Sequence, residues 1–420
     1  ISEAPQRFNV RVLPELAGRH PETLVFQLWG GWFTNIDDLT VREGILECAQ
    51  AAGFNDIVAG DRWTTDHSPP RGLGQTLTTN FKPWGMNLSD HLEAEPEQRL
   101  ITGDGEPLDD RMCMSFLLGE GWPAVETALK ARIDEVRPQV VDIDYEYGPY
   151  AGPHSCYCPL CLAAFRERDG VPADATLDAE SIKQEHAAEW IDFMARRVAE
   201  MFAKFKETVH RLAPGTEFTI YSGYQTPSNA EMYGIDWQYI GDLQSCDRAG
   251  CGYGDGEPVI AKTVEALQGI PLVCGLLSVP YDTTITTPLT PVTKARSLRM
   301  LLAGTGGILV YDRKSFDGRV WHAIGEVTRL AAEHEDVFLN GKPAAALEGF
   351  DITQGQVLSA GQTTLVCVMN QGSRVVEHQI QLPVDAGAGV EFYSGQAVGA
   401  GEQVSCELQP GDAAVYVLKR

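Results

Sequence analysis

Residues 140–165 read VVDIDYEYGPYAGPHSCYCPLCLAAF, a hydrophobic strand pattern that carries three carboxylates and then runs into a cysteine cluster. Successive side chains of a strand point to opposite faces, so Asp142, Asp144 and Glu146 are predicted to share one face. Parallel strands are usually buried on both faces, and three acids there cost too much free energy to be packing residues. The pattern therefore predicts acids that end in a solvated cleft.

The cysteines that follow, Cys156, Cys158 and Cys161, have the C-x-C-x-x-C spacing of a thiolate metal site. The alternatives are reduced thiols on a surface loop, or a site in which His154 is a ligand. A zinc ion closed by four thiolates has no open position for substrate, so such a site has a structural role. An acid-bearing strand end beside a metal-stapled loop is typical of an enzyme active site.

Apolar strand patterns alternate with amphipathic helical patterns up to about residue 340. Strands are predicted at 23–30, 55–60, 82–88, 140–148, 217–223, 239–246, 271–279 and 306–312, and the clearest helices at 123–137 and 184–212. This order predicts an α/β fold, a (β/α)8 TIM barrel over residues 1–340. The alternative is a doubly wound open sheet, but no glycine-rich phosphate-binding motif follows the first strand. Residues 89–122 are predicted to form a long irregular loop over the active face.

Short β-rich runs alternate with Gly-rich turns over residues 345–420, which predicts a small C-terminal antiparallel β-sandwich domain. Cys367 and Cys406 lie in two of its predicted strands and are interpreted as unpaired, with a disulfide as the alternative. The same alternative is left open for Cys246 and Cys251.

The formal net charge of -25 argues against nucleic acid and anionic membranes as partners and favours a neutral or cationic small ligand. No apolar run reaches the roughly 18 residues of a membrane-spanning helix, and the first ten residues lack the apolar core of a signal peptide. A cytoplasmic location is expected. Because the chain begins without Met, a processed start and a secreted or periplasmic location are left open, as is a homo-oligomer.

The strand end and the loop behind it resemble the family 42 glycoside hydrolases, the microbial β-galactosidases. Those enzymes carry Asn-Glu-Tyr-Gly, then Cys-x-Cys-x-x-Cys and a helix with Phe; this chain reads YEYG at 145–148, then CYCPLC and LAAFRE. In that family a fourth cysteine from the loop after strand three completes a structural zinc site, and Cys113 occupies the corresponding place. The resemblance implies that Glu146 is the general acid and that no organic cofactor is used. It implies these zinc ligands: Cys113, Cys156, Cys158 and Cys161.

The chain departs from that family at three points. Tyr145 replaces the Asn before the acid, the strand predicted at 271–279 lacks the nucleophilic glutamate, and the middle domain that helps those enzymes trimerise is absent. The sequence is therefore interpreted as a distant relative within the barrel glycosidases, without an inherited β-galactosidase specificity.

Residues 142–146, DIDYE, are also similar to the D-x-D-x-E ending of the family 18 chitinase motif. That resemblance implies that Asp144 supports the N-acetyl group of the substrate while Glu146 acts as the acid. The glycine-bearing front half of the motif is missing, because this chain reads RPQVV at 137–141.

Glycoside cleavage needs a proton donor and a second carboxylate that acts as nucleophile or base. Glu146 is predicted at the C-terminal barrel face, and Asp144 would help it hold its proton by like-charge repulsion. Candidates for the second carboxylate are Asp61, Asp247, Asp282 and Asp312, of which Asp247 and Asp312 are predicted across the barrel mouth. The alternative for these two is an ion pair with the neighbouring Arg248 or Arg313. A separation of about 5 Å predicts retention of configuration, and roughly 6.5–9.5 Å predicts inversion.

Side chains near predicted strand ends are candidates for sugar binding, because apolar ring faces stack on pyranose C–H groups. The aromatic candidates, for which a place in the core is the alternative, are Trp29, Trp32, Trp63, Trp84, Tyr147 and Tyr224. The polar candidates are Gln27, Asp61, Arg62, Asn87 and His91.

The sequence thus predicts a glycoside hydrolase that acts on a neutral glycoside or oligosaccharide. One alternative is a catalytically inactive barrel that binds carbohydrate, and another is a chitinase-like, substrate-assisted hydrolase of N-acetylhexosaminides. A metal-dependent hydrolase or lyase is disfavoured, because no His-x-His or His-Glu-x-x-His cluster occurs.

Overall fold

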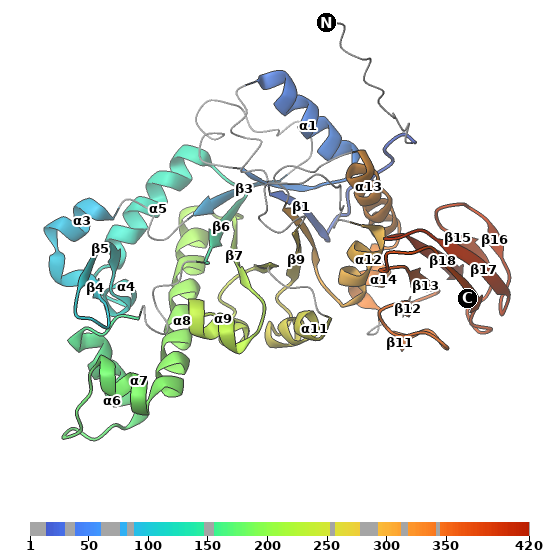
Figure 1. Ribbon diagram of the computed structural model, residues 1–420. Helices are drawn as coiled ribbons and strands as arrows, with labels where there is room; N and C mark the ends of the chain where they lie inside the picture. Colours follow the sequence, from blue (N-terminus) through green and yellow to red (C-terminus); the bar gives the residue numbers. More distant parts are fainter. Residues whose placement is uncertain are drawn as a thin grey trace, which may run out of the picture.

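The computed structural model describes residues 14–29, 38–59, 76–81, 88–146, 155–252, 257–277, 293–311, 318–341 and 345–419. Within them, parallel strands surrounded by helices precede a set of antiparallel strands that lies beside α12, α13 and α14 (Figure 1).

Eight parallel strands pair side by side in the closed order β1-β10-β9-β8-β7-β6-β3-β2. Parallel neighbours need a crossover connection, and helices supply it in the connections that the structure describes. The strands are β1 (Val25–Trp29), β2 (Asp56–Ala59), β3 (Thr76–Phe81), β6 (Val140–Asp144), β7 (Glu217–Gly223), β8 (Arg248–Gly252), β9 (Leu272–Leu277) and β10 (Gly307–Tyr311). The predicted α/β class and its eight-strand parallel arrangement therefore hold.

The longer surrounding helices bury an apolar stripe, most clearly α8, whose buried face includes Trp190, Phe202 and Phe205. Pro123 occupies the first turn of α5, as predicted. The helices are α1 (Leu39–Ala51), α5 (Trp122–Val136), α8 (Ala187–Leu212), α9 (Pro227–Tyr233), α10 (Trp237–Leu243), α11 (Glu257–Ala266), α12 (Lys294–Leu302), α13 (Gly318–Glu333) and α14 (Glu335–Asn340). None in the described ranges has the length and apolarity needed to cross a membrane.

Two barrel strands lie outside their predicted ranges. The third strand is β3, which ends before the predicted range 82–88 begins. Residues 239–246 were predicted as the sixth strand, but most of them belong to α10, whose N-cap Asp236 accepts a hydrogen bond from the N–H of Gln238. The sixth strand is β8, and its sequence RAGCG has too many glycines to give a strand signal.

The segment predicted as an irregular loop is mostly structured. It contains α3 (Ser89–Ala94), the 3₁₀ helix η4 (Pro96–Gln98), the hairpin β4 (Arg99–Ile101) and β5 (Pro107–Met112), and α4 (Met114–Leu118). Two helices that follow β6, α6 (Pro159–Asp169) and α7 (Ala179–Glu185), lie on the same side of the molecule (Figure 1).

The C-terminal residues form a six-stranded and a two-stranded antiparallel sheet, in the orders β11-β12-β13-β18-β15-β16 and β14-β17. A separate apolar cluster, which includes Val366 and Ile380, fills the space between these sheets. The opposite face of the large sheet, with Leu365 and Val415, belongs to the same apolar core as the barrel helices. The strands are β11 (Ala345–Ala346), β12 (Gly355–Ala360), β13 (Thr363–Met369), β14 (Val376–Gln381), β15 (Gly389–Glu391), β16 (Ala397–Val398), β17 (Gln403–Leu408) and β18 (Ala413–Lys419).

All ten cysteines lie in described residues and all are free thiols. The disulfide alternatives for Cys367 with Cys406 and for Cys246 with Cys251 are therefore wrong.

Polar side chains occupy the N-terminal end of the barrel interior, where most barrels are apolar. Arg248 of β8 forms a 2.8 Å ion pair with Asp56 of β2, and these strands are not neighbours in the ring, so the pair crosses the interior. Gln27 donates a 3.0 Å hydrogen bond to the same carboxylate. Gln27 was predicted to bind sugar hydroxyls; it is instead buried in this network.

Asp142 belongs to the same buried layer, which corrects its predicted place in a solvated cleft. Its Oδ1 accepts a 2.6 Å hydrogen bond from the Thr219 hydroxyl, and its Oδ2 has no hydrogen-bond partner among the described residues. Burial raises the pKa of Asp142 to about 7; the Thr219 hydroxyl and Arg248 oppose the rise, whereas Asp144 and Asp56 add to it.

Lys294 joins the barrel to the C-terminal sheets. Its ammonium lies 2.9 Å from Glu326 of α13 and 2.7 Å from Asp412 before β18, and 4.0 Å from the ring centre of Tyr393. Burial alone would lower the pKa of Lys294, but the two carboxylates hold it above its usual range.

We expect Lys294→Ala to lower the free energy of unfolding by about 2 kcal/mol, because two carboxylates lose their shared cation and keep only partial contact with solvent. Urea denaturation measures the change. Lys130→Ala removes the exposed Lys130–Asp134 pair on α5 and should cost less than about 0.5 kcal/mol. Equal losses in the two variants would show that the Lys294 cluster stabilises the fold no more than an exposed ion pair does.

We expect Asp142→Asn to reduce the pH dependence of stability. Between about pH 4 and pH 7 the folded chain keeps a proton on Asp142 that the unfolded chain has released, so wild-type stability falls as pH rises through this window. The ideal limit of this loss is about 4 kcal/mol. The measured quantity is the free energy of unfolding in urea, variant minus wild type. This difference should be larger at pH 8 than at pH 4 for Asp142→Asn, and should not change with pH for Asp134→Asn on the exposed face of α5. A difference between Asp142→Asn and wild type that does not vary with pH would contradict the assignment.

Candidate active site and thiolate cluster

Strand β6 separates its apolar and acidic side chains onto opposite faces, as predicted. Val141, Ile143 and Tyr145 are fully buried in the core between the barrel and the helices, and the Tyr145 ring lies 5.1 Å from that of Phe202 on α8. The alternate residues Asp142 and Asp144 therefore point into the barrel interior.

Glu146 follows β6 directly and continues this alternation at the C-terminal end of the strand. The N–H of Tyr145 donates a 2.8 Å hydrogen bond to the carbonyl of Tyr221, so the pairing with β7 extends past the last residue of β6. Glu146 is half-buried, and its Oε1 and the Oδ1 of Asp144 are buried atoms. The two carboxyl groups are therefore partly shielded from water.

Two aromatic side chains, Trp29 of β1 and Tyr221 of β7, meet across the barrel interior with ring centres 5.1 Å apart. Tyr221 is the cross-strand neighbour of Asp144. A Cβ on Gly252 would lie 1.9 Å from the Tyr221 hydroxyl oxygen, and one on Gly250 would lie 3.0 Å from its ring. The glycines of β8 therefore make room for this tyrosine.

Sequence reasoning selected Trp29 but missed Tyr221. Tyr221 could have been found from an aromatic residue on one strand with glycines at alternate positions of the next strand, here Gly250 and Gly252. That signal was lost because β8 was itself predicted in the wrong place.

Asp247 was predicted to follow the sixth strand, but it precedes β8 and so lies at the N-terminal end of the barrel, away from Glu146. Its carboxylate accepts hydrogen bonds from the N–H of Phe218 at 2.8 Å and from His210 at 2.7 Å, and Lys206 lies 3.1 Å away. Burial alone would raise the pKa of Asp247, but these partners hold it below its usual range. Asp247 is a structural ion-pair residue, and its predicted role opposite Glu146 is wrong.

Tyr224 was predicted as a sugar platform, but it is buried in the core outside the barrel, and burial beside Cys274 and Cys251 raises its pKa well above the usual value. His91 lies on α3, with Nε2 3.0 Å from Oε1 of Gln98. The remaining predicted residues lie outside the described ranges: Asp61, Arg62, Trp32, Trp63, Trp84, Asn87, Tyr147, His154, Asp282, Asp312 and Arg313.

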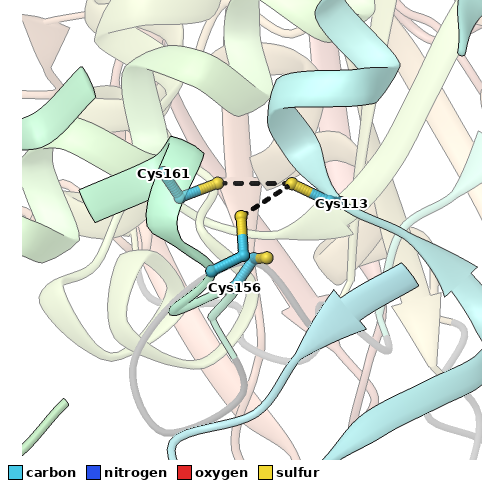
Figure 2. A group of neighbouring side chains, drawn as sticks. Cys113, Cys156 and Cys161 are labelled. Atoms are coloured by element: carbon cyan, nitrogen blue, oxygen red, sulfur yellow. Dashed lines mark hydrogen bonds between the residues drawn. The ribbon is translucent and has the colours of Figure 1, made fainter. Parts of the chain in front are cut away.

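The structure brings the four predicted cysteines together. Cys113, at the start of α4, and the 156–161 turn that leads into α6 place four buried sulfur atoms within 4.8 Å of one another (Figure 2). The Cys113 sulfur lies 3.4 Å from that of Cys158 and 3.5 Å from that of Cys161. Tetrahedral zinc with Zn–S bonds of about 2.3 Å separates its sulfur atoms by about 3.8 Å, so the donor set fits this ion.

The cluster lies where two segments distant in sequence meet. The N–H of Tyr157 donates a 2.8 Å hydrogen bond to the Ile101 carbonyl, so the cysteine turn pairs with β4. The Tyr157 ring stacks on Trp190 of α8 at 5.2 Å, with the planes 9° apart. The end of the connection that leaves Glu146 is therefore anchored to both the hairpin and the helix layer.

No protein-family model and no curated protein matches the sequence. Solved structures do match its fold. A family 36 α-galactosidase from Geobacillus stearothermophilus has a TM-score of 0.56 and 10% identity; the match covers 94% of this chain but only 55% of that enzyme. The chain likewise spans 55% of the galactosidase domain of an α-galactosidase-sucrose kinase, at a TM-score of 0.57.

Two β-galactosidases match over nearly their whole length. One from Bacillus circulans sp. alkalophilus has a TM-score of 0.64 and 8% identity, with 94% of this chain and 99% of that chain covered. A family 42 β-galactosidase from G. stearothermophilus has a TM-score of 0.61 and 11% identity, with 96% and 100% covered. At these identities the similarity shows the fold alone, which this chain shares with both β-galactosidases, one of them a family 42 enzyme.

Proposed function

We propose that the protein is a glycoside hydrolase in which Glu146 is the general acid. The observation that carries this proposal is the acidic face of β6, which delivers Asp144 and Glu146 to the C-terminal end of a parallel barrel. The fold shared with galactosidases supports it. The substrate is a neutral glycoside or oligosaccharide, and the barrel is the catalytic unit to which the C-terminal sheets are appended.

In this mechanism Glu146 protonates the leaving oxygen of the glycosidic bond. Asp144 is the preceding carboxylate on the same face of β6, one strand repeat deeper in the barrel interior. Trp29 and Tyr221 supply an apolar interior beneath the site. Because Asp247 is at the wrong end of the barrel, Asp312 is the remaining candidate for the second carboxylate across the mouth, with Asp61 and Asp282 as alternatives.

The thiolate cluster is proposed as a structural zinc site. Cys113, Cys156, Cys158 and Cys161 would hold the ion, which supplies a cross-link between α4 and the turn before α6 and takes no part in the reaction. The ion would affect catalysis only indirectly, because it would hold the 156–161 turn at which the connection from Glu146 ends.

A second candidate is a substrate-assisted hydrolase of N-acetylhexosaminides. It is favoured by the observed common face of Asp142 and Asp144, the two aspartates of the D-x-D-x-E pattern. Asp144 would then orient the N-acetyl group of the substrate, which replaces the second carboxylate as nucleophile.

We expect Glu146→Gln to lower kcat about 100- to 10,000-fold on whichever substrate the wild type cleaves, because the amide cannot donate the proton. The measurement is hydrolysis of a panel of aryl glycosides and oligosaccharides, including N-acetylhexosaminides. Glu207→Gln, on the exposed face of α8, is the matched control and should retain full activity.

Three outcomes of the panel separate the candidates. Cleavage of N-acetylhexosaminides alone would favour substrate assistance. Full activity of Glu146→Gln would remove Glu146 from the mechanism. Sugar binding by both proteins without cleavage of any substrate would instead identify a catalytically inactive, carbohydrate-binding barrel.

We expect about one zinc ion per chain in metal analysis, and we expect Cys158→Ser to lose it and to lower the free energy of unfolding by about 2 kcal/mol. Cys406→Ser, which removes a thiol outside the cluster, should keep the metal and most of the stability. A metal-free wild type whose stability is unchanged in Cys158→Ser would exclude the zinc site.

A further inference from the structure

The thiolate cluster has an excess of negative charge that the surrounding protein must stabilise. Four thiolates around a divalent cation leave two uncompensated negative charges, and all four cysteines are buried. Buried charge is costly unless hydrogen-bond donors surround it. The donors around the sulfur atoms therefore control how firmly the site holds its ion.

Among the described residues, two donors from outside the cysteine turn reach the sulfur atoms. The N–H of Ile101, at the end of β4, donates to the Cys156 sulfur at 3.5 Å. The Ser115 hydroxyl oxygen lies 3.2 Å from the Cys161 sulfur. A metal-bound cysteine has lost its proton and can only accept, so in the loaded site the Ser115 hydroxyl must be the donor.

Helix α6 adds a third stabilising contribution. Cys158 is its N-cap and Cys161 lies in its first turn, where free N–H groups and the positive end of the helix dipole favour a thiolate. Cys161 thus receives stabilisation from its own helix and from Ser115 on α4. Ser115 is the one side-chain donor among these three contributions, so it can be changed without altering the backbone.

We propose that Ser115 is a positioning residue for the metal: its hydroxyl donates a hydrogen bond to the Cys161 sulfur and thereby sets the zinc affinity of the cluster. This inference rests on the zinc site proposed above. Ser115 comes from α4 and Cys161 from α6, so the bond also links the two segments that the ion joins.

The test compares Ser115→Ala with wild type by competition against a chromophoric zinc chelator. We expect the variant to bind zinc about 10- to 100-fold more weakly, the usual effect of losing such a partner. Ser115→Thr retains the hydroxyl and should restore most of the affinity. Ser228→Ala is the matched control, because Ser228 also occupies the second position of a short helix, α9, but is exposed and far from the cysteines in sequence.

Cobalt substitution gives a readout that does not depend on stability or activity. Loss of the hydrogen bond should shift the thiolate-to-cobalt charge-transfer band in Ser115→Ala and leave it unchanged in Ser228→Ala. Wild-type affinity and an unshifted band in Ser115→Ala would overturn the role of Ser115 while leaving the zinc site intact. A wild-type protein that binds neither zinc nor cobalt would overturn the zinc site itself and this inference with it.

Discussion

The alternation of side chains along β6 is the constraint on which the acidic face of this strand depends. Val141, Ile143 and Tyr145 are buried against the helices, and their burial fixes Asp142 and Asp144 in the barrel interior. A shift of one residue would place the acids in an apolar layer and the apolar residues in the interior. The register of β6 against β3 and β7 is therefore strongly specified.

Inside the barrel, different kinds of side chain lie in layers along the axis. The Arg248–Asp56 ion pair lies at the N-terminal end, and the aromatic contact between Trp29 and Tyr221 lies nearer the mouth. The mouth then carries Glu146. The lower network joins strands across the interior, whereas Glu146 is the carboxylate that we propose as the general acid.

The predicted elements failed where local sequence and tertiary context disagree. Residues 239–246 contain enough apolar residues to predict a strand, yet the Asp236 cap and the helical spacing of Trp237 and Ile240 make them α10. β8 has almost no local strand propensity, because it is rich in glycine. Two of these glycines, Gly250 and Gly252, leave room for the Tyr221 side chain on the neighbouring strand. Because of this single exchange of helix and strand, Asp247 was predicted at the C-terminal end of the barrel, whereas it lies at the N-terminal end.

The sequence by itself determined the acidic strand, the helix–strand alternation and the local cysteine turn, because each depends on residues a few positions apart. Cys113 entered only through a resemblance, and the contact of Ser115 with Cys161 was not predictable at all. Only the tertiary structure decided that Asp142 is buried with a raised pKa, that Asp247 lies at the opposite end from Glu146, and that Tyr221 meets Trp29. The reason is physical: burial and cross-barrel contact depend on how the strands pair in the ring, and no local pattern encodes that pairing.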